Sequence, residues 1–166
     1  MSFLIDAYEG WSAEEAVRRF KLYGEYLEKV KSALPKSAYS FVTAHWHFEF
    51  QDRHCPHDGW IEHLRIWEDA SGDRKEFRQT QIDVRLLGAF HDAHLELNYR
   101  DVKSYTLSAQ PRADRQAARN VGHGDWLIDE VRLSENNLVL HEILFRNRSR
   151  WLIEASDFLW EWKPLK

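Results

Sequence analysis

The feature that most constrains the fold of this chain is a series of short segments in which apolar and polar residues alternate. Alternation with a period of two places the apolar side chains of a strand on one face and the polar side chains on the other. The connections read QDRHCPHDG, SGDRKE, YRDV, SENN and RNRS, and they are rich in residues that favour turns. The pattern predicts strands at residues 42–50, 60–68, 77–87, 94–99, 102–107, 126–133, 138–145 and 151–162.

One amphipathic helix precedes these segments. Ser12 and Glu15 have the spacing of a capping box, in which each side chain accepts from a free backbone N–H at the helix start. Trp11 stands where it can pack on Ala16 as a hydrophobic staple. Pro35 ends the helix at about residue 34. Steps of three and four residues line one apolar face, which comprises Ala16, Phe20, Tyr23, Leu27, Val30 and Leu34.

These patterns predict an α+β fold, with one N-terminal amphipathic helix followed by a mostly antiparallel, curved β-sheet. Residues 111–120 are expected to form a short helix or a loop. We expect one domain over residues 1–166, because the chain is long enough to bury a core and contains no repeat or linker-like stretch.

Composition limits the partners and the cellular compartment that we expect for this protein. The net charge of −4 does not demand a nucleic-acid partner. The single Cys55 excludes an internal disulfide and favours a reducing compartment. No signal-peptide pattern opens the sequence, and no apolar stretch approaches the ~18 residues of a transmembrane helix. We therefore expect a cytoplasmic protein that has no membrane partner.

Five of the nine histidines and the cysteine fall within the stretch HWHFEFQDRHCPHDGWIEH. On a strand, His45 and His47 share a face and lie roughly 6.6 Å apart, given a rise of ~3.3 Å per residue. His63 joins that face if Leu64 points to the core. His54 and His57 belong to the intervening turn. These five histidines are candidate ligands for zinc or a similar divalent metal.

A second interpretation of the same stretch stays open. The spacing is irregular and offers only one thiolate, whereas structural zinc sites usually combine two closely spaced ligand pairs. The histidines then belong to the polar surface of a hairpin. If a metal does bind, Glu49 is the candidate base of a metal-dependent hydrolase. His141-Glu142 does not extend this hypothesis, because Phe145 stands where a helical zinc motif requires a second histidine.

Other polar groups are candidates for binding. His91 and Asp92 form a neighbouring imidazole–carboxylate pair, although adjacent strand residues point to opposite faces. The stretch GHGDW offers a close backbone approach beside its two polar residues. Two arginine clusters are candidate anion sites, of which the first is Arg112, Arg115 and Arg119. The remaining binding candidates are His123 and Asp125 of GHGDW and, in the second arginine cluster, Arg146 and Arg148 beside Arg150.

The second half of the chain carries a resemblance. FHDA, GDWLIDEV, HEILF and WLIEASDF, within residues 88–162, resemble segments of small uncharacterised bacterial domains, some of them immunity proteins of toxin systems. The resemblance implies a mostly antiparallel α+β domain that binds rather than catalyses. It implies no particular catalytic or binding residue.

The leading expectation is therefore a non-enzymatic binding domain of bacterial, cytoplasmic origin, either of immunity type or self-associating. Tryptophan and tyrosine are abundant and suit an interface, and the edges of a strand-rich sheet need covering. We expect a protein partner or a homodimer, and no cofactor. The alternative is the metal-dependent, zinc-type hydrolase built on the His45 and His47 region.

Overall fold

The computed structural model of the protein describes residues 2–6, 8–109 and 122–165. It confirms the α+β class, with two α-helices and a six-stranded antiparallel sheet. In chain order the elements are η1 (Tyr8–Gly10), α1 (Ala13–Val30), α2 (Lys36–Val42), β1 (Trp60–Ser71), β2 (Phe77–Leu87), β3 (Ala93–Leu107), β4 (Trp126–Leu133), β5 (Val139–Phe145) and β6 (Arg150–Pro164).

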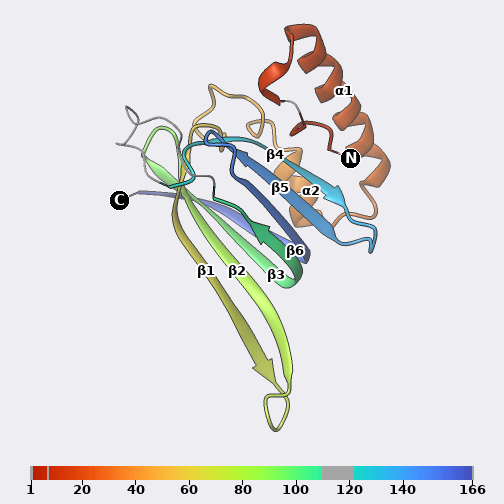
Figure 1. Ribbon diagram of the computed structural model, residues 1–166, viewed down its shortest axis with the longest axis vertical. Helices are drawn as coiled ribbons and strands as arrows, with labels where there is room; N and C mark the ends of the chain where they lie inside the picture. Colours follow the sequence, from red (N-terminus) through yellow and green to blue (C-terminus); the bar gives the residue numbers. More distant parts are fainter. Residues whose placement is uncertain (1, 7, 110–121, 166) are drawn as a thin grey trace.

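The sheet consists of two three-stranded meanders joined along their last strands. Its order is β1-β2-β3-β6-β5-β4, and every neighbouring pair is antiparallel. β1 and β4 are therefore the two edge strands. Figure 1 shows the sheet curving around α2, with the β1–β2 hairpin extending well beyond the rest of the molecule.

The N-terminal helix forms largely as its sequence predicts. The Ser12 side chain accepts from the backbone N–H of Glu15 at 3.1 Å, which confirms the N-cap. The Glu15 carboxylate binds Arg18 and Arg19 instead of the backbone, so the capping box is only half formed. α1 ends at Val30, about one turn before the predicted end.

A strand was expected over residues 42–50, and this prediction is wrong. Residues 36–42 form α2, and the chain then runs through successive turns to β1. The backbone N–H of His47 donates to the carbonyl of Ala44, and that of Glu49 donates to the carbonyl of Trp46. Bonds between residues three apart consume the groups that a strand would offer to a neighbour.

The strands expected at residues 94–99 and 102–107 are one strand, β3, with a bulge between them. Asp101 has a φ of +50° and is held by the side chains of Gln81, Ser156 and Lys103, the last at 2.6 Å from its carboxylate. Its N–H donates to the Gln81 side chain, and its carboxylate accepts from Ser156. The YRDV sequence therefore bends a continuous strand instead of ending it.

The core lies between the helices and the concave face of the sheet. Phe41 of α2 is fully buried and contacts aromatic rings of β5, β6 and the following loop. Leu4 and Ile5 add the N-terminal segment to this core, anchored where the Glu130 carboxylate accepts from the Leu4 N–H at 2.6 Å. Neither helix in the described ranges is long and apolar enough to cross a bilayer.

One edge strand of the sheet is capped by α1 and the other is exposed. On β4, the Tyr23 hydroxyl accepts from the N–H of Val131 at 2.6 Å and donates to its carbonyl at 2.9 Å. The Tyr26 hydroxyl accepts from the N–H of Leu133 at 2.8 Å. α1 therefore caps the β4 edge. β1 is the opposite edge, and ten of its twelve residues are exposed.

Candidate functional site

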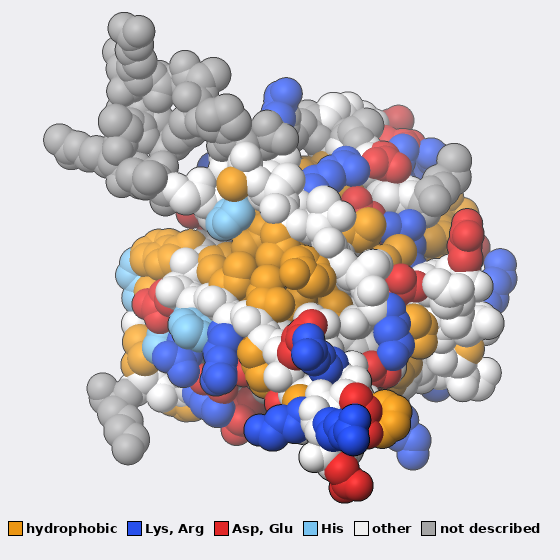
Figure 2. Space-filling view, turned by 60° about the horizontal axis from the view of Figure 1, so that its bottom comes forward, with side chains coloured by type: hydrophobic (Ala, Val, Ile, Leu, Met, Phe, Trp, Pro, Cys, Tyr) orange, Lys and Arg blue, Asp and Glu red, His pale blue; other side chains and the backbone are white. Residues whose placement is uncertain are grey.

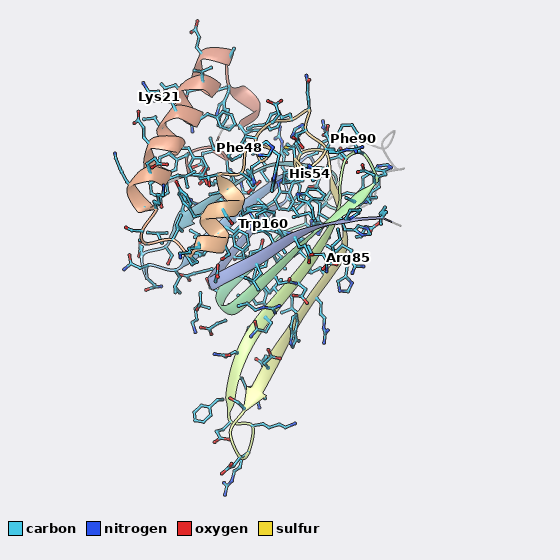
Figure 3. All side chains as sticks on the ribbon, turned by 180° about the vertical axis from the view of Figure 1, so that it is seen from behind. Lys21, Phe48, His54, Arg85, Phe90 and Trp160 are labelled. Atoms are coloured by element: carbon cyan, nitrogen blue, oxygen red, sulfur yellow. The ribbon has the colours of Figure 1, made fainter. Side chains whose placement is uncertain are left out.

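A surface groove lies where the loop after α2 meets the end of β6. Its volume is about 870 Å³. Figure 3 shows three residues of its wall, with His54 between Trp160, next to α2, and Phe90. The side chains that line the groove are His45, Trp46, Gln51, Asp52, Arg53, His54, Phe90, Trp160, Glu161 and Trp162.

Three tryptophans form the apolar part of this tryptophan groove. The Trp46 ring lies edge-on to Trp160 at 5.3 Å and to Trp162 at 6.3 Å between centroids. The Trp160 indole N–H donates to the backbone carbonyl of Ser37 in α2. Period-two alternation at the end of β6 directs Trp160 and Trp162 to the same face, so the sheet and α2 hold these rings in place.

Polar side chains surround the tryptophans. Arg53 pairs with Asp92 at 2.7 Å, and its guanidinium lies over the Phe90 ring. The Asp52 carboxylate accepts from the backbone N–H of His54, which lowers the pKa of Asp52. The lining contains two carboxylates, Asp52 and Glu161, and one guanidinium, that of Arg53. Glu161 lies 3.4 Å from the Lys163 ammonium, and Arg53 is paired with Asp92. The groove therefore has an apolar centre and a slightly acidic rim.

A second polar cluster lies entirely inside the protein, centred on Asp129 of β4. One oxygen of this carboxylate accepts from His47 at 3.1 Å and from His141 at 3.0 Å. Its other oxygen accepts from the Trp126 indole at 3.0 Å. The Tyr99 hydroxyl donates to the second ring nitrogen of His141 at 2.7 Å, which leaves the first nitrogen of that ring to donate to Asp129.

The Asp129 cluster fits a structural function. Burial alone raises the pKa of Asp129, but the adjacent His47 and His141 outweigh burial and hold this pKa below its ordinary value. The imidazole side chains have no exposed surface, and the Asp129 side chain has almost none. A substrate therefore does not reach these groups, and their hydrogen bonds instead fix β4, β5, β3 and the loop after α2 to one another.

The sequence analysis did not identify this cluster. His47 was assigned to an outward strand face, whereas it is buried beneath Phe41. Asp129 interrupts the apolar run WLIDEV, which is the one signal that marks it. His141 likewise alternates with apolar residues in VLHEILF, and this period predicts that it shares a face with Val139 and Ile143, both of which are buried.

The five candidate metal ligands do not converge. His45 lines the tryptophan groove and His47 lies in the core, so the two do not share a strand face. The His54 ring contacts Asp52, and His57 stacks on Phe50 and donates to the carbonyl of Leu127. His63 lies on the outer face of β1, opposite Arg85. In the part of the chain that the structure describes, no group of three or more His, Cys, Asp or Glu side chains has an arrangement that could hold a metal ion.

Cys55, the only thiol, does not join a metal site either. It is buried and donates to the backbone carbonyl of His47 at 3.0 Å. Burial raises the pKa of the Cys55 thiol to about 12. The thiol is therefore protonated and held within the loop.

The candidate binding residues do not form one site. His91 has a φ of +57° and packs edge-on against Trp60, while Asp92 pairs with Arg53 at the groove. Two other candidates form an ion pair, and the remaining two lie apart. Asp125 binds Arg146 at 2.9 Å, His123 packs on Trp151, and Arg148 stands in the turn before β6 with a φ of +67°. The Arg112, Arg115 and Arg119 cluster and the element expected at residues 111–120 lie outside the described residues.

Comparison with known proteins gives no significant match. No family model, no curated protein and no solved structure matches the chain.

Proposed function

We propose that the protein is a non-enzymatic binding domain and that it receives a segment of a partner protein in the tryptophan groove. The observation that supports this is the gathering of Trp46, Trp160 and Trp162 in one open groove with a polar rim. Protein interfaces concentrate binding energy in tryptophan, tyrosine and arginine at a desolvated centre, and a polar rim excludes water around it.

The chemistry of the groove indicates the kind of segment. The tryptophan rings offer flat apolar surface to a large apolar or aromatic side chain. The rim adds the carboxylate of Asp52, whereas Glu161 is paired with Lys163 at 3.4 Å and Arg53 with Asp92 at 2.7 Å. The expected ligand is an extended peptide segment with an apolar anchor residue and lysine or arginine beside it.

An immunity-type function, in which a toxin is the partner, and a cytoplasmic location are part of this proposal. They rest on the resemblance of residues 88–162 and on the single free thiol. No observation favours the alternative, a metal-dependent hydrolase, because the histidines that it requires occupy separate surroundings.

The proposal is tested by selecting random twelve-residue peptides on the immobilised protein. Selected peptides are expected to share an apolar anchor flanked by basic residues. Bound peptides should shift the indole N–H signals of the three groove tryptophans in proton–nitrogen NMR spectra. Phe90→Ala removes a rim side chain that is 55 % exposed, and it should weaken peptide binding by about tenfold.

Phe77→Ala provides the matched control. Phe77 is 65 % exposed and lies at the tip of the β1–β2 hairpin, away from the groove. Its replacement should leave peptide affinity unchanged. The proposal is overturned if no peptide is enriched, or if the enriched peptides bind the Phe90 and Phe77 variants equally well.

A further inference from the structure

The unequal edges of the sheet lead to an inference beyond the proposed function. Two tyrosine hydroxyls of α1 bind the backbone of β4, and one of them bonds both the N–H and the C=O of Val131. An edge strand with free N–H and C=O groups is a template for another strand, and proteins usually block it. In the described part of the chain, β1 pairs with β2 along one side only, and nothing caps its other side.

β1 also carries apolar side chains where a lone hairpin would be expected to be polar. Leu64 and Ile66 are 36 % and 38 % exposed, although they stand opposite the buried Val84 and Ile82 of β2. Figure 2 looks toward this end of the molecule and shows Lys, Arg, Asp and Glu side chains gathered at the tip of the hairpin. An exposed edge strand of this length and apolar content is normally covered by a partner.

The outer face of β1 carries one positive and one negative side chain, both in contact with Trp67. Arg65 lies over the Trp67 ring at 4.6 Å, and Asp69 accepts from the Trp67 indole N–H at 2.9 Å. Among the described residues, neither Arg65 nor Asp69 takes part in an ion pair. The positive charge therefore precedes Trp67 by two residues and the negative charge follows it by two.

We propose that two copies of the protein pair through their β1 strands, antiparallel, with Trp67 on the two-fold axis. This axis is perpendicular to the joined sheet, so each residue lies on the same face in both copies. Because residues that stand opposite each other in an antiparallel pair also share a face, the axis must lie between the two copies of one residue. With Trp67 on the axis, Arg65 of each copy lies opposite Asp69 of the other.

Neighbouring registers are less favourable. An axis through Arg65 sets that arginine against its own copy and Glu62 against Glu68. An axis through Glu68 sets this carboxylate against itself. An axis through Ile66 sets Arg65 opposite Trp67 and leaves no arginine–aspartate pair. The register centred on Trp67 makes two such pairs and places the bodies of the two copies at opposite ends of the paired hairpins.

Sedimentation equilibrium of the full chain tests the proposal by charge exchange. The protein is expected to dimerise. Arg65→Asp and Asp69→Arg each create like-charge pairs across the axis, and each should raise the dimer dissociation constant by about tenfold or more. The double variant exchanges the two charges and should restore the dissociation constant of the natural sequence to within about threefold.

Lys21→Glu is the control, because Lys21 is an exposed residue of α1, at the opposite edge of the sheet from β1, and its replacement changes the net charge as Arg65→Asp does. It should leave dimerisation unchanged. A monomer at all concentrations overturns the proposal, and so does a double variant that stays as weak as the single ones. Peptide binding by the groove is read independently, so either proposal can fail while the other stands.

Discussion

At the scale of the residue, the buried polar groups matter most for the folded state. Asp129 accepts three hydrogen bonds in the core and joins strands that are distant in the sequence. Alternation in the sequence shows that residue 141 shares a face with apolar neighbours, but it does not show which carboxylate meets it. His47 approaches Asp129 from a loop whose path depends on tertiary packing, so the cluster was not predictable from the sequence.

Asp129→Asn tests the structural function of this cluster. The amide removes the buried charge and one acceptor position, so at least one imidazole N–H loses its partner. The free energy of unfolding should fall by about 3 kcal/mol in urea denaturation at neutral pH. Asp125→Asn is the control, because that carboxylate is 31 % exposed and its pair with Arg146 is worth under about 1 kcal/mol. Equal losses in the two variants would contradict the assignment.

The same carboxylate contributes to acid sensitivity. Its folded pKa lies below the unfolded value of 3.8, so its contribution to stability is present above pH 3.8 and is lost as the pH falls through the folded pKa. The difference in unfolding free energy between the natural sequence and Asp129→Asn should therefore shrink between about pH 5 and pH 2. A constant difference over this range would show that the pKa of Asp129 is the same in the folded and unfolded states.

At the scale of the element, the strands were largely predictable and the connection before them was not. The apolar–polar alternation of β1 to β6 and the turn residues between them locate every strand of the sheet to within a few residues. The alternation of residues 42–50 is equally regular, yet those residues form the end of α2 and turns. A strand requires a neighbour for its backbone, and the local sequence carries no information on whether one is available.

Tyr23→Phe tests the cap on β4. It deletes one hydroxyl and leaves the buried N–H and C=O of Val131 without partners. Unfolding free energy should fall by about 2 kcal/mol, and the Val131 amide should exchange with solvent faster in hydrogen-exchange NMR. Tyr39→Phe removes an exposed hydroxyl that binds Glu28 and should change the stability by less than about 0.5 kcal/mol. Unchanged Val131 exchange would refute the cap.

At the scale of the whole molecule, the groove and the open edge of β1 are two separate surfaces, and each suits a different kind of contact. The groove lies at the junction of α2 and β6, and β1 lies across the sheet from β4 on the extended hairpin (Figure 1). In the register centred on Trp67, residues 63–71 of one copy pair with residues 71–63 of the other, and none of these residues lines the groove. Both contacts are therefore compatible in one assembly.

Self-association of this kind makes thermal stability depend on concentration. If the dimer forms only between folded chains, a hundredfold increase in protein concentration should raise the unfolding midpoint by about 3 °C, measured by differential scanning calorimetry. The Arg65→Asp variant should show a smaller shift than the Lys21→Glu variant over the same range. Identical shifts in both variants would show that the concentration dependence does not arise from pairing at β1.

The tyrosine cap on β4 has a consequence for the size of any assembly. If both edges of the sheet were open, copies could be added at either side without limit, and the product would be a fibre. Pairing at β1 uses the open edge of both copies and leaves only capped edges at the ends. Assembly then stops at two chains, because the tyrosine hydroxyls of α1 prevent a further copy from pairing with β4.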